Sequence, residues 1–311
     1  MRIAGKNDTM QVTGVICVNE YHERKQEGQE DLFMAGDLSK AQIIVLIIAC
    51  CGIFLSGIML FKTAREYKLA EDEYSALDKF TTKVESTALA PMALGPVAIE
   101  EEVTEELARN YNRTDFPDFD IDFDGLAQIN DQVVAWLVMD SVGISYPVVQ
   151  NPDEGENEYY LHHTFENENN SSGCVFMDWE NKPDLSGWNT FIYGHNMKNG
   201  TMFGSLKKLL NEDGLYESDP YFYVFLRDGI YRYKIFSYYL DPTDSKMYWN
   251  CNTFKQYRQY QRTALEKSQH DCGVEVSPDD NMVTLVTCSG TGSSKMRQFV
   301  HGIFVDRYVY D

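Results

Sequence analysis

From about Asp122 onward, hydrophobic and polar residues follow one another in short runs that are bounded by turn residues. Eight of these runs are rich in Val, Ile, Tyr and Phe, which is typical of β-strands. Asp228-Gly229 separates two of them and is a common hairpin turn. The predicted strands are Val133–Met139, Ile144–Val149, Cys174–Trp179, Thr190–Tyr193, Phe222–Leu226, Ile230–Leu240, Met282–Thr287 and Phe299–Tyr308. Eight strands of this kind predict a barrel or a sandwich.

Two helices are predicted between these strands. Phe203–Leu210 follows a turn that contains Gly200, and Thr253–Ser268 places four large apolar residues near helical spacing. The long polar face of the second helix is typical of a surface helix laid over a barrel. No segment repeats at a fixed period, which argues against a solenoid.

An uncharged run of 19 residues, 43–61, stands near the N-terminus. A helix of this length spans about 28 Å, close to the hydrocarbon thickness of a bilayer. A buried core helix would show polar positions on one side. The apolar part of a signal peptide is shorter and is followed by a small-residue cleavage site. We therefore predict a transmembrane signal anchor over residues 42–61.

The predicted span divides the rest of the chain into three parts. Residues 1–41 are polar and weakly patterned, and we expect a tail, which is cytoplasmic in the orientation implied by the resemblance described below. Residues 62–114 are expected to form a stalk or linker: they begin with a helical pattern, continue through Pro and Gly, and end in an acidic run. Residues 115–311 carry the strand pattern and are expected to form the main domain.

The charges beside the span bear on its orientation. Lys40 flanks the N-terminal side, whereas Lys62, Arg65 and Lys68 flank the C-terminal side. By the positive-inside rule, these charges would place the C-terminal side in the cytoplasm.

Composition excludes some classes of function. The formal net charge is −21 and the isoelectric point is near 4.6, so the chain repels phosphate backbones and nucleic acid is not an expected partner. Seven cysteines include no C-x-x-C pair, and no metal or other cofactor is predicted. The cysteines are too sparse for a disulfide scaffold, although Cys251 and Cys272 could pair outside the cell.

Cys288 ends a predicted strand and opens a loop of small residues, 289–294. That position suits an exposed nucleophile, but also a buried small apolar residue. Arg297 follows nine residues later, before the last strand. In an antiparallel pair the end of one strand meets the start of the next, so the two residues can face each other. A guanidinium there could stabilise an oxyanion and lower the thiol pKa, or it could belong to a surface salt bridge.

His195 lies after a predicted strand and before a Gly-containing turn. The near-neutral pKa of histidine suits proton transfer, although a packing or surface histidine fits this position as well. His162 and His163 are expected to pack or to form hydrogen bonds, His301 to be structural, and His270 has no obvious partner. The chain contains no G-x-S-x-G, H-E-x-x-H or P-loop motif.

Three segments carry a resemblance to a known family. Residues 284–288 (TLVTC) with Arg297 match a T-L-x-T-C…R signature, and residues 193–203 (YGHNMKNGTMF) match a Y-G-H-N-M-x-x-G-x-M-F segment. Residues 122–150 and 159–161 match a pattern of opening strands. By these motifs the chain resembles the class B sortases. Two details depart from some relatives: Val286 stands where they carry a small polar residue, and the Cys–Arg interval varies.

The resemblance implies a mostly β fold with helices: an eight-stranded sortase-like β-barrel, an N-terminal helical segment and one transmembrane helix. It implies a cysteine transpeptidase in a single-pass membrane protein, with the catalytic domain, 115–311, outside the cell despite the flanking charges. Cys288 would be the nucleophile that forms a thioester, His195 the proton donor and acceptor, and Arg297 the oxyanion stabiliser. Thr287 and Ser289 would contact the substrate, and no metal or cofactor would be needed.

The implied substrate is a surface protein or pilin with a C-terminal sorting motif, cleaved after Thr. The acyl group would pass to an amine of a cell-wall precursor or of another pilin. Three alternatives remain open: a pilin-polymerising sortase, a cysteine hydrolase that releases its substrate to water, and a catalytically idle, membrane-tethered binding protein with the same barrel.

Overall fold

The computed structural model describes residues 39–84, 113–153, 155, 157–248, 250–288 and 295–310, except for the side chain of Cys288. The chain divides into two compact units, residues 1–63 and 64–311. Helix α2 (Lys40–Leu77) contributes to both. Among the described residues, it is the helix long and apolar enough to cross a membrane, with a mean hydropathy of 2.9 over an 18-residue window. By length and composition it could therefore be a membrane anchor.

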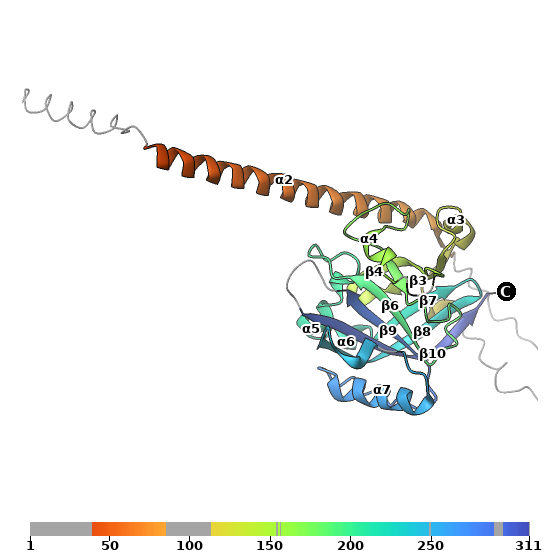
Figure 1. The fold of residues 1–311 in the computed structure, drawn as a ribbon. Helices are drawn as coiled ribbons and strands as arrows, with labels where there is room; N and C mark the ends of the chain where they lie inside the picture. Colours follow the sequence, from red (N-terminus) through yellow and green to blue (C-terminus); the bar gives the residue numbers. More distant parts are fainter. Residues whose placement is uncertain are drawn as a thin grey trace, which may run out of the picture. The chain divides into compact units, whose positions relative to one another are not determined.

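Eight strands in the described part of the second unit form a closed barrel (Figure 1). The order around the barrel is β10-β8-β7-β3-β4-β5-β6-β9, and β9 pairs with β10 to close it. Two neighbouring pairs, β4 with β5 and β6 with β9, are parallel, and the others are antiparallel. The strands are β3 (Val133–Met139), β4 (Ile144–Val149), β5 (Val175–Met177), β6 (Asn189–His195), β7 (Tyr221–Leu226), β8 (Gly229–Pro242), β9 (Met282–Cys288) and β10 (Met296–Val309).

The predicted eight-stranded barrel is thus confirmed, and closure excludes the sandwich. The bounds of β3 and β4 match the prediction, and Arg227-Asp228 forms the tight connection between β7 and β8. β5 is shorter than predicted. β8 and β10 are longer, because they pair with each other along nearly their whole length.

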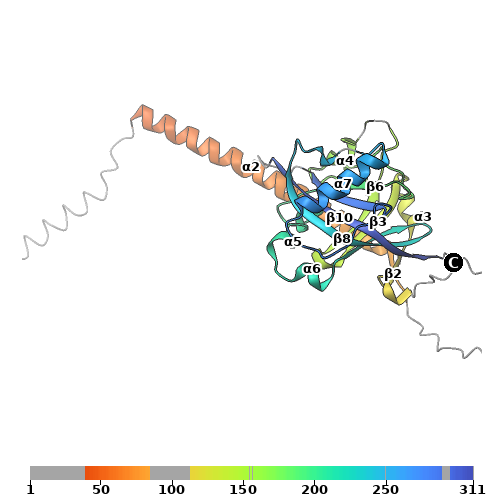
Figure 2. The same ribbon diagram turned by 90° about the horizontal axis from the view of Figure 1, so that it is seen from below.

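Helix α7 (Phe254–Lys267) lies on the outside of the barrel against β8 (Figure 2). Its bounds follow the prediction, since Thr253 caps the helix by accepting a hydrogen bond from the Gln256 amide.

The remaining elements are short. They are η1 (Asp78–Phe80), β1 (Thr81–Lys83), η2 (Arg113–Asp115), β2 (Phe119–Ile121), α3 (Phe123–Ala127), η3 (Asp140–Val142), α4 (Tyr159–His162), η4 (Phe203–Ser205), α5 (Lys208–Asn211), α6 (Leu215–Ser218) and η5 (Lys246–Tyr248).

The predicted helix over residues 203–210 is wrong as a single helix, because the structure has the separate turns η4 and α5 there. The amides of Leu206 and Leu209 bond to carbonyls three residues back, as in a 3₁₀ helix. A β-carbon at Gly204 would lie 2.3 Å from the Met197 carbonyl oxygen. The backbone at Gly204 therefore packs closely against the loop that contains Met197, and this close contact favours a 3₁₀ turn over an α-helical turn.

The last turns of α2 are part of the barrel unit. Ala70, Tyr74 and Leu77 are buried, and the Tyr74 ring meets the Tyr146 ring edge-on at 5.5 Å. These three residues lie within the range 62–114, which was expected to be a stalk or linker. In the structure they are part of the hydrophobic core.

His301, on β10, is fully buried in the barrel wall. Its Nδ1 lies 3.0 Å from the Thr284 hydroxyl and its Nε2 lies 3.1 Å from the Tyr239 hydroxyl. Burial lowers the pKa of His301 to about 3, so the ring is neutral in the folded protein at ordinary pH. The expected structural role of this histidine agrees with its surroundings.

Replacing His301 with Gln tests this role through the pH dependence of stability. The pKa of His301 falls from 6.5 to about 3 on folding, so protonation favours the unfolded chain. Above pH 6.5 this residue is neutral in both states and the free energy of unfolding is unaffected by its titration. As the pH falls from 6.5 toward 3, the unfolded chain binds a proton that the folded protein does not, and the free energy of unfolding declines. Between pH 7 and pH 4, the free energy of unfolding should fall further in the wild type than in His301→Gln, by on the order of 3 kcal/mol. Denaturant titrations at both pH values measure the difference, and equal pH dependence in the two proteins would contradict the assignment.

Candidate functional site

Three neighbouring strands bring His195, Cys288 and Arg297 to one rim of the barrel. β6 and β9 run parallel and end at His195 and Cys288, which are register partners. Adjacent strands lie about 4.8 Å apart. β10 runs antiparallel to β9, and the paired residues nearest the rim are Phe299 and Val286. Arg297 and Cys288 each lie two positions beyond that pair. The backbone thus gathers the three residues that the sequence singled out.

A buried series of side-chain hydrogen bonds sets the register of these strands. The Thr284 hydroxyl on β9 donates to Asn189 Oδ1 on β6 at 2.8 Å, and His301 of β10 binds the same hydroxyl. His301 also binds the Tyr239 hydroxyl on β8. Slipping any of these strands would leave buried polar groups without partners, which is costly.

His195 is half-buried, and its ring is oriented by the main chain. Nε2 lies 2.7 Å from the Leu161 carbonyl oxygen. Because a carbonyl only accepts, Nε2 carries a proton, and in the neutral ring Nδ1 keeps its lone pair. Burial lowers the pKa of His195 from 6.5, and the positive charge of Arg297 lowers it further, while the Leu161 carbonyl opposes the shift. The ring can therefore accept a proton at neutral pH.

Gly173 makes room for this ring. Its φ is +57°, a conformation that L side chains rarely adopt. A β-carbon there would lie 2.5 Å from the Tyr160 carbonyl oxygen and 3.0 Å from Cδ2 of His195. Only glycine fits without displacing the histidine or the main chain beside it.

Arg297 is held by an aromatic ring. Its guanidinium lies over Tyr248, 5.3 Å from the ring centroid, and Tyr248 packs on Phe299 at 4.9 Å. The buried Nε of Arg297 has no hydrogen-bond partner among the described residues. Asp241, its register partner on β8, binds Lys267 at 2.7 Å. Within the described part of the chain Arg297 thus forms no salt bridge, and its N–H groups can serve an anionic oxygen.

Thr287 and Ser289 were expected to contact substrate. Thr287 is buried, and its hydroxyl accepts the Gln298 amide at 2.8 Å, which ties β10 to β9 beside Cys288. Ser289, with the rest of the loop 289–294, lies outside the described residues, as does the Cys288 side chain. Substrate contact by Thr287 and Ser289 stays a prediction.

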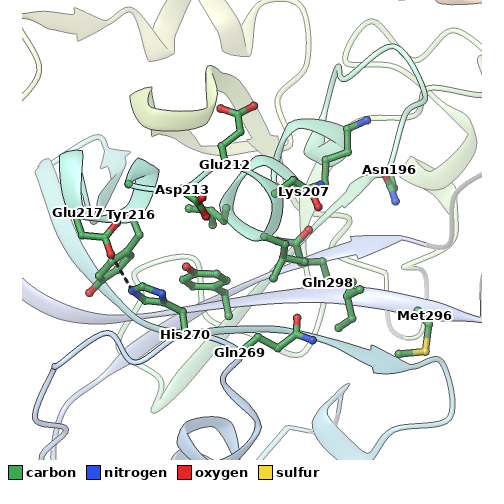
Figure 3. Close-up of a pocket in the computed structure, with 16 residues that line it drawn as sticks. Asn196, Lys207, Glu212, Asp213, Tyr216, Glu217, Gln269, His270, Met296 and Gln298 are labelled. Carbon is green, nitrogen blue, oxygen red and sulfur yellow. Dashed lines mark ion pairs between the residues drawn. The ribbon is translucent and has the colours of Figure 1, made fainter.

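A polar groove of about 930 Å³ opens next to the rim (Figure 3). One wall includes Asn196, directly after His195, together with Met296 and Gln298, which flank Arg297. Lys207, the acidic residues Glu212 and Asp213 between α5 and α6, and Glu217 of α6 form another part of the lining. The groove thus reaches the immediate neighbours of two site residues.

His270, for which the sequence showed no obvious partner, has one in the structure. Its Nε2 lies 3.3 Å from Oε1 of Glu217 at the end of the groove, as the dashed line in Figure 3 marks. Its ring packs on Tyr216 and Tyr238. The contact joins α6 to the segment after α7, and such a long-range pairing has no local sequence signal.

Other thiols of the barrel unit are unsuited to nucleophilic attack. Cys251 and Cys272 are free and half-buried, and burial raises the pKa of both to about 11. The buried Cys174 has its pKa raised to about 12. A thiol is nucleophilic as the thiolate, so these cysteines remain protonated and inert near neutral pH. The disulfide considered for Cys251 and Cys272 is not present.

Sequence reasoning missed three groups that shape the site. Leu161 acts through its main-chain carbonyl, which every residue type possesses. Gly173 had no turn motif that pointed to the histidine. Tyr248 lies in a segment without strand or helix periodicity, so only the fold places it beneath Arg297.

Comparisons with known proteins agree with one another. The model of the sortase domain family matches residues 137–305. Sortase B of Listeria monocytogenes is 33% identical over 166 residues, 52% of this chain and 65% of that protein, so just under two thirds of that relative is spanned. A solved structure of sortase B from B. anthracis is 34% identical, with a TM-score of 0.53 over 60% of this chain and 84% of that one. A Staphylococcus aureus sortase B–substrate complex is 29% identical, with a TM-score of 0.54 over 59% and 84%.

The environment of His195 predicts its titration. Burial and the nearby positive charge of Arg297 lower its pKa, so the ring should titrate below pH 6.5. An NMR pH titration of protein labelled at histidine measures this value, and the signal missing from His195→Gln identifies the residue. A midpoint at or above 6.5 would show that the ring is solvated or paired with an anion.

Proposed function

The chain belongs to the sortase family, and on that premise we propose that it is a class B sortase-type cysteine transpeptidase. It cleaves a C-terminal sorting motif after Thr and joins the acyl group to an amine. The observation that carries the proposal is the pairing of His195 with Cys288 at the rim, with Arg297 on the next strand.

In the first half-reaction, His195 accepts the thiol proton and the Cys288 sulfur attacks the threonine carbonyl carbon. The C=O electrons move to oxygen, and Arg297 donates hydrogen bonds to that oxyanion. The carbonyl re-forms as the C–N bond breaks, and His195 returns its proton to the departing amine. A thioester between Cys288 and the threonine remains.

In the second half-reaction, an acceptor amine attacks the thioester carbon. His195 takes a proton from the amine nitrogen, the C–S bond breaks, and the proton returns to the sulfur. The product is an amide, and the enzyme is restored. A ring that is neutral at rest, as the lowered pKa of His195 makes it, can take the proton in both halves.

The proposed partners follow from the same likeness. The Staphylococcus aureus relative was solved with its substrate. For this chain we take the donor to be a surface protein or pilin with a sorting signal, and the acceptor to be an amine such as that of a cell-wall precursor.

The proposed location is the cell membrane, with one span over residues 42–61 and the catalytic domain outside. The apolar part of α2 supports the span, whereas Lys62, Arg65 and Lys68 oppose this orientation. Protease treatment of intact cells should digest a C-terminal tag and spare an N-terminal one. The reverse result would place the domain in the cytoplasm.

Activity of the full chain in detergent tests the site. Quenched peptides carrying Thr-containing sorting motifs should be cleaved, and Cys288→Ala should abolish both cleavage and the thioester adduct seen by mass spectrometry. Arg297→Lys should lower kcat by about a hundredfold, because it removes the planar donor pair at the oxyanion. Tyr231→Phe removes a part-buried hydroxyl, bonded to Asp228 and Arg307 near the distant β7–β8 hairpin, and serves as the matched control with unchanged rates.

The products distinguish the alternatives. Cleavage that persists in Cys288→Ala refutes the nucleophile. Peptide acid in place of amide, with amine in excess, indicates a hydrolase. Preference for a pilin lysine over a cell-wall amine identifies a pilin-polymerising enzyme. No cleavage, together with a thiol inert to alkylation, favours the idle binding protein.

A further inference from the structure

We propose that Tyr74, on helix α2, is a positioning residue for His195. It holds in place the segment 159–174, against which the imidazole rests. The inference builds on the proposed function, because it assumes that proton transfer by His195 limits turnover.

The segment 159–174 touches the imidazole at two points. Near its start, the Leu161 carbonyl accepts the hydrogen bond from Nε2 at 2.7 Å. Near its end, Gly173 is so close that a β-carbon would stand 3.0 Å from Cδ2 of the ring. The two ends are joined, because the Cys174 amide donates to the Tyr160 carbonyl at 2.9 Å. Moving one end therefore moves both contacts with the ring.

Helix α2 braces this segment through one stripe of its surface. The buried Tyr74 hydroxyl donates to the Gly173 carbonyl at 2.8 Å. One residue earlier, Glu73 accepts the Glu166 amide at 2.9 Å. Two turns before that, the Glu66 carbonyl and carboxylate accept from Asn170 and Ser171, at 3.0 and 2.8 Å. Figure 1 draws the last turns of α2 beside the part of the chain that carries α4.

The Tyr74 bond is the most direct of these braces. It acts on Gly173, the residue in van der Waals reach of the ring, whereas the glutamates act several residues away. Gly173 has an uncommon φ of +57°, so its carbonyl direction depends on its surroundings. Catalysis by a positioned base is sensitive to displacements of about 1 Å. Losing this bond should therefore loosen the imidazole without unfolding the barrel.

The test uses the full chain in detergent with Tyr74→Phe, which keeps the ring and removes the hydroxyl. We expect kcat to fall about tenfold with KM within about twofold, and Tm within a few degrees of the wild type. Nitrogen-15 NMR of labelled histidine should show a single Nε2–H tautomer of His195 in the wild type, and mixed tautomers in the variant. Tyr231→Phe is the matched control, since it also removes one tyrosine hydroxyl that forms hydrogen bonds, here with Asp228 and Arg307.

A second variant tests the proposal even if Tyr74→Phe does not fold. Glu66→Ala combined with Glu73→Ala removes two half-exposed acceptors from the same stripe and should change kcat and the tautomer signal in the same direction. An unchanged tautomer and unchanged kcat in either folded variant overturn the proposal, as do equal changes in Tyr231→Phe. If no peptide is transferred even by the wild type, the proposed function fails, while the histidine spectrum still decides whether Tyr74 orients the ring.

Discussion

The parallel pairing of β6 with β9 is the constraint on which the site depends. Since the two strands run in the same direction, their C-terminal residues, His195 and Cys288, arrive at the same rim and in register. β10 then runs back along β9 and contributes Arg297. A slip of one residue would separate the partners and turn every side chain of the strand to the other face. The buried chain from Asn189 through Thr284 to His301 opposes such a slip.

The site residues are held in two different ways. The backbones of His195, Cys288 and Arg297 all belong to barrel strands, and the Arg297 side chain is further supported by the Tyr248 ring. His195 ends its strand, and its ring leans on a segment outside the barrel sheet. That segment is braced by hydrogen bonds from α2, the helix that also contains the apolar stretch 43–61. The backbone positions of the three residues therefore follow from sheet geometry, whereas the orientation of the His195 ring also depends on packing between the segment 159–174 and helix α2.

Burial separates reactive from inert groups that share the same chemistry. His301 and His195 both have lowered pKa values, but His301 is enclosed among aromatic rings and bonded at both nitrogens. His195 is half-exposed, and its Nε2 is engaged by the Leu161 carbonyl. The thiols of Cys174, Cys251 and Cys272 are likewise kept protonated by desolvation. Arg297 forms no salt bridge with the described residues, although the chain carries a net charge of −21.

The sequence by itself determined the elements with local signals: the short apolar runs that form the strands, the hairpin turn that includes Asp228, the helix over residues 253–268 and the apolar run 43–61. Its motifs also singled out His195, Cys288 and Arg297. Only the tertiary structure decided the parallel register of β6 and β9, the two short turns in residues 203–210, and the packing of Ala70, Tyr74 and Leu77. It alone joined Tyr74 to Gly173, 99 residues apart, and Leu161 to His195. These contacts use main-chain carbonyls, which are the same in every residue, so their partners are chosen by the folded path of the chain.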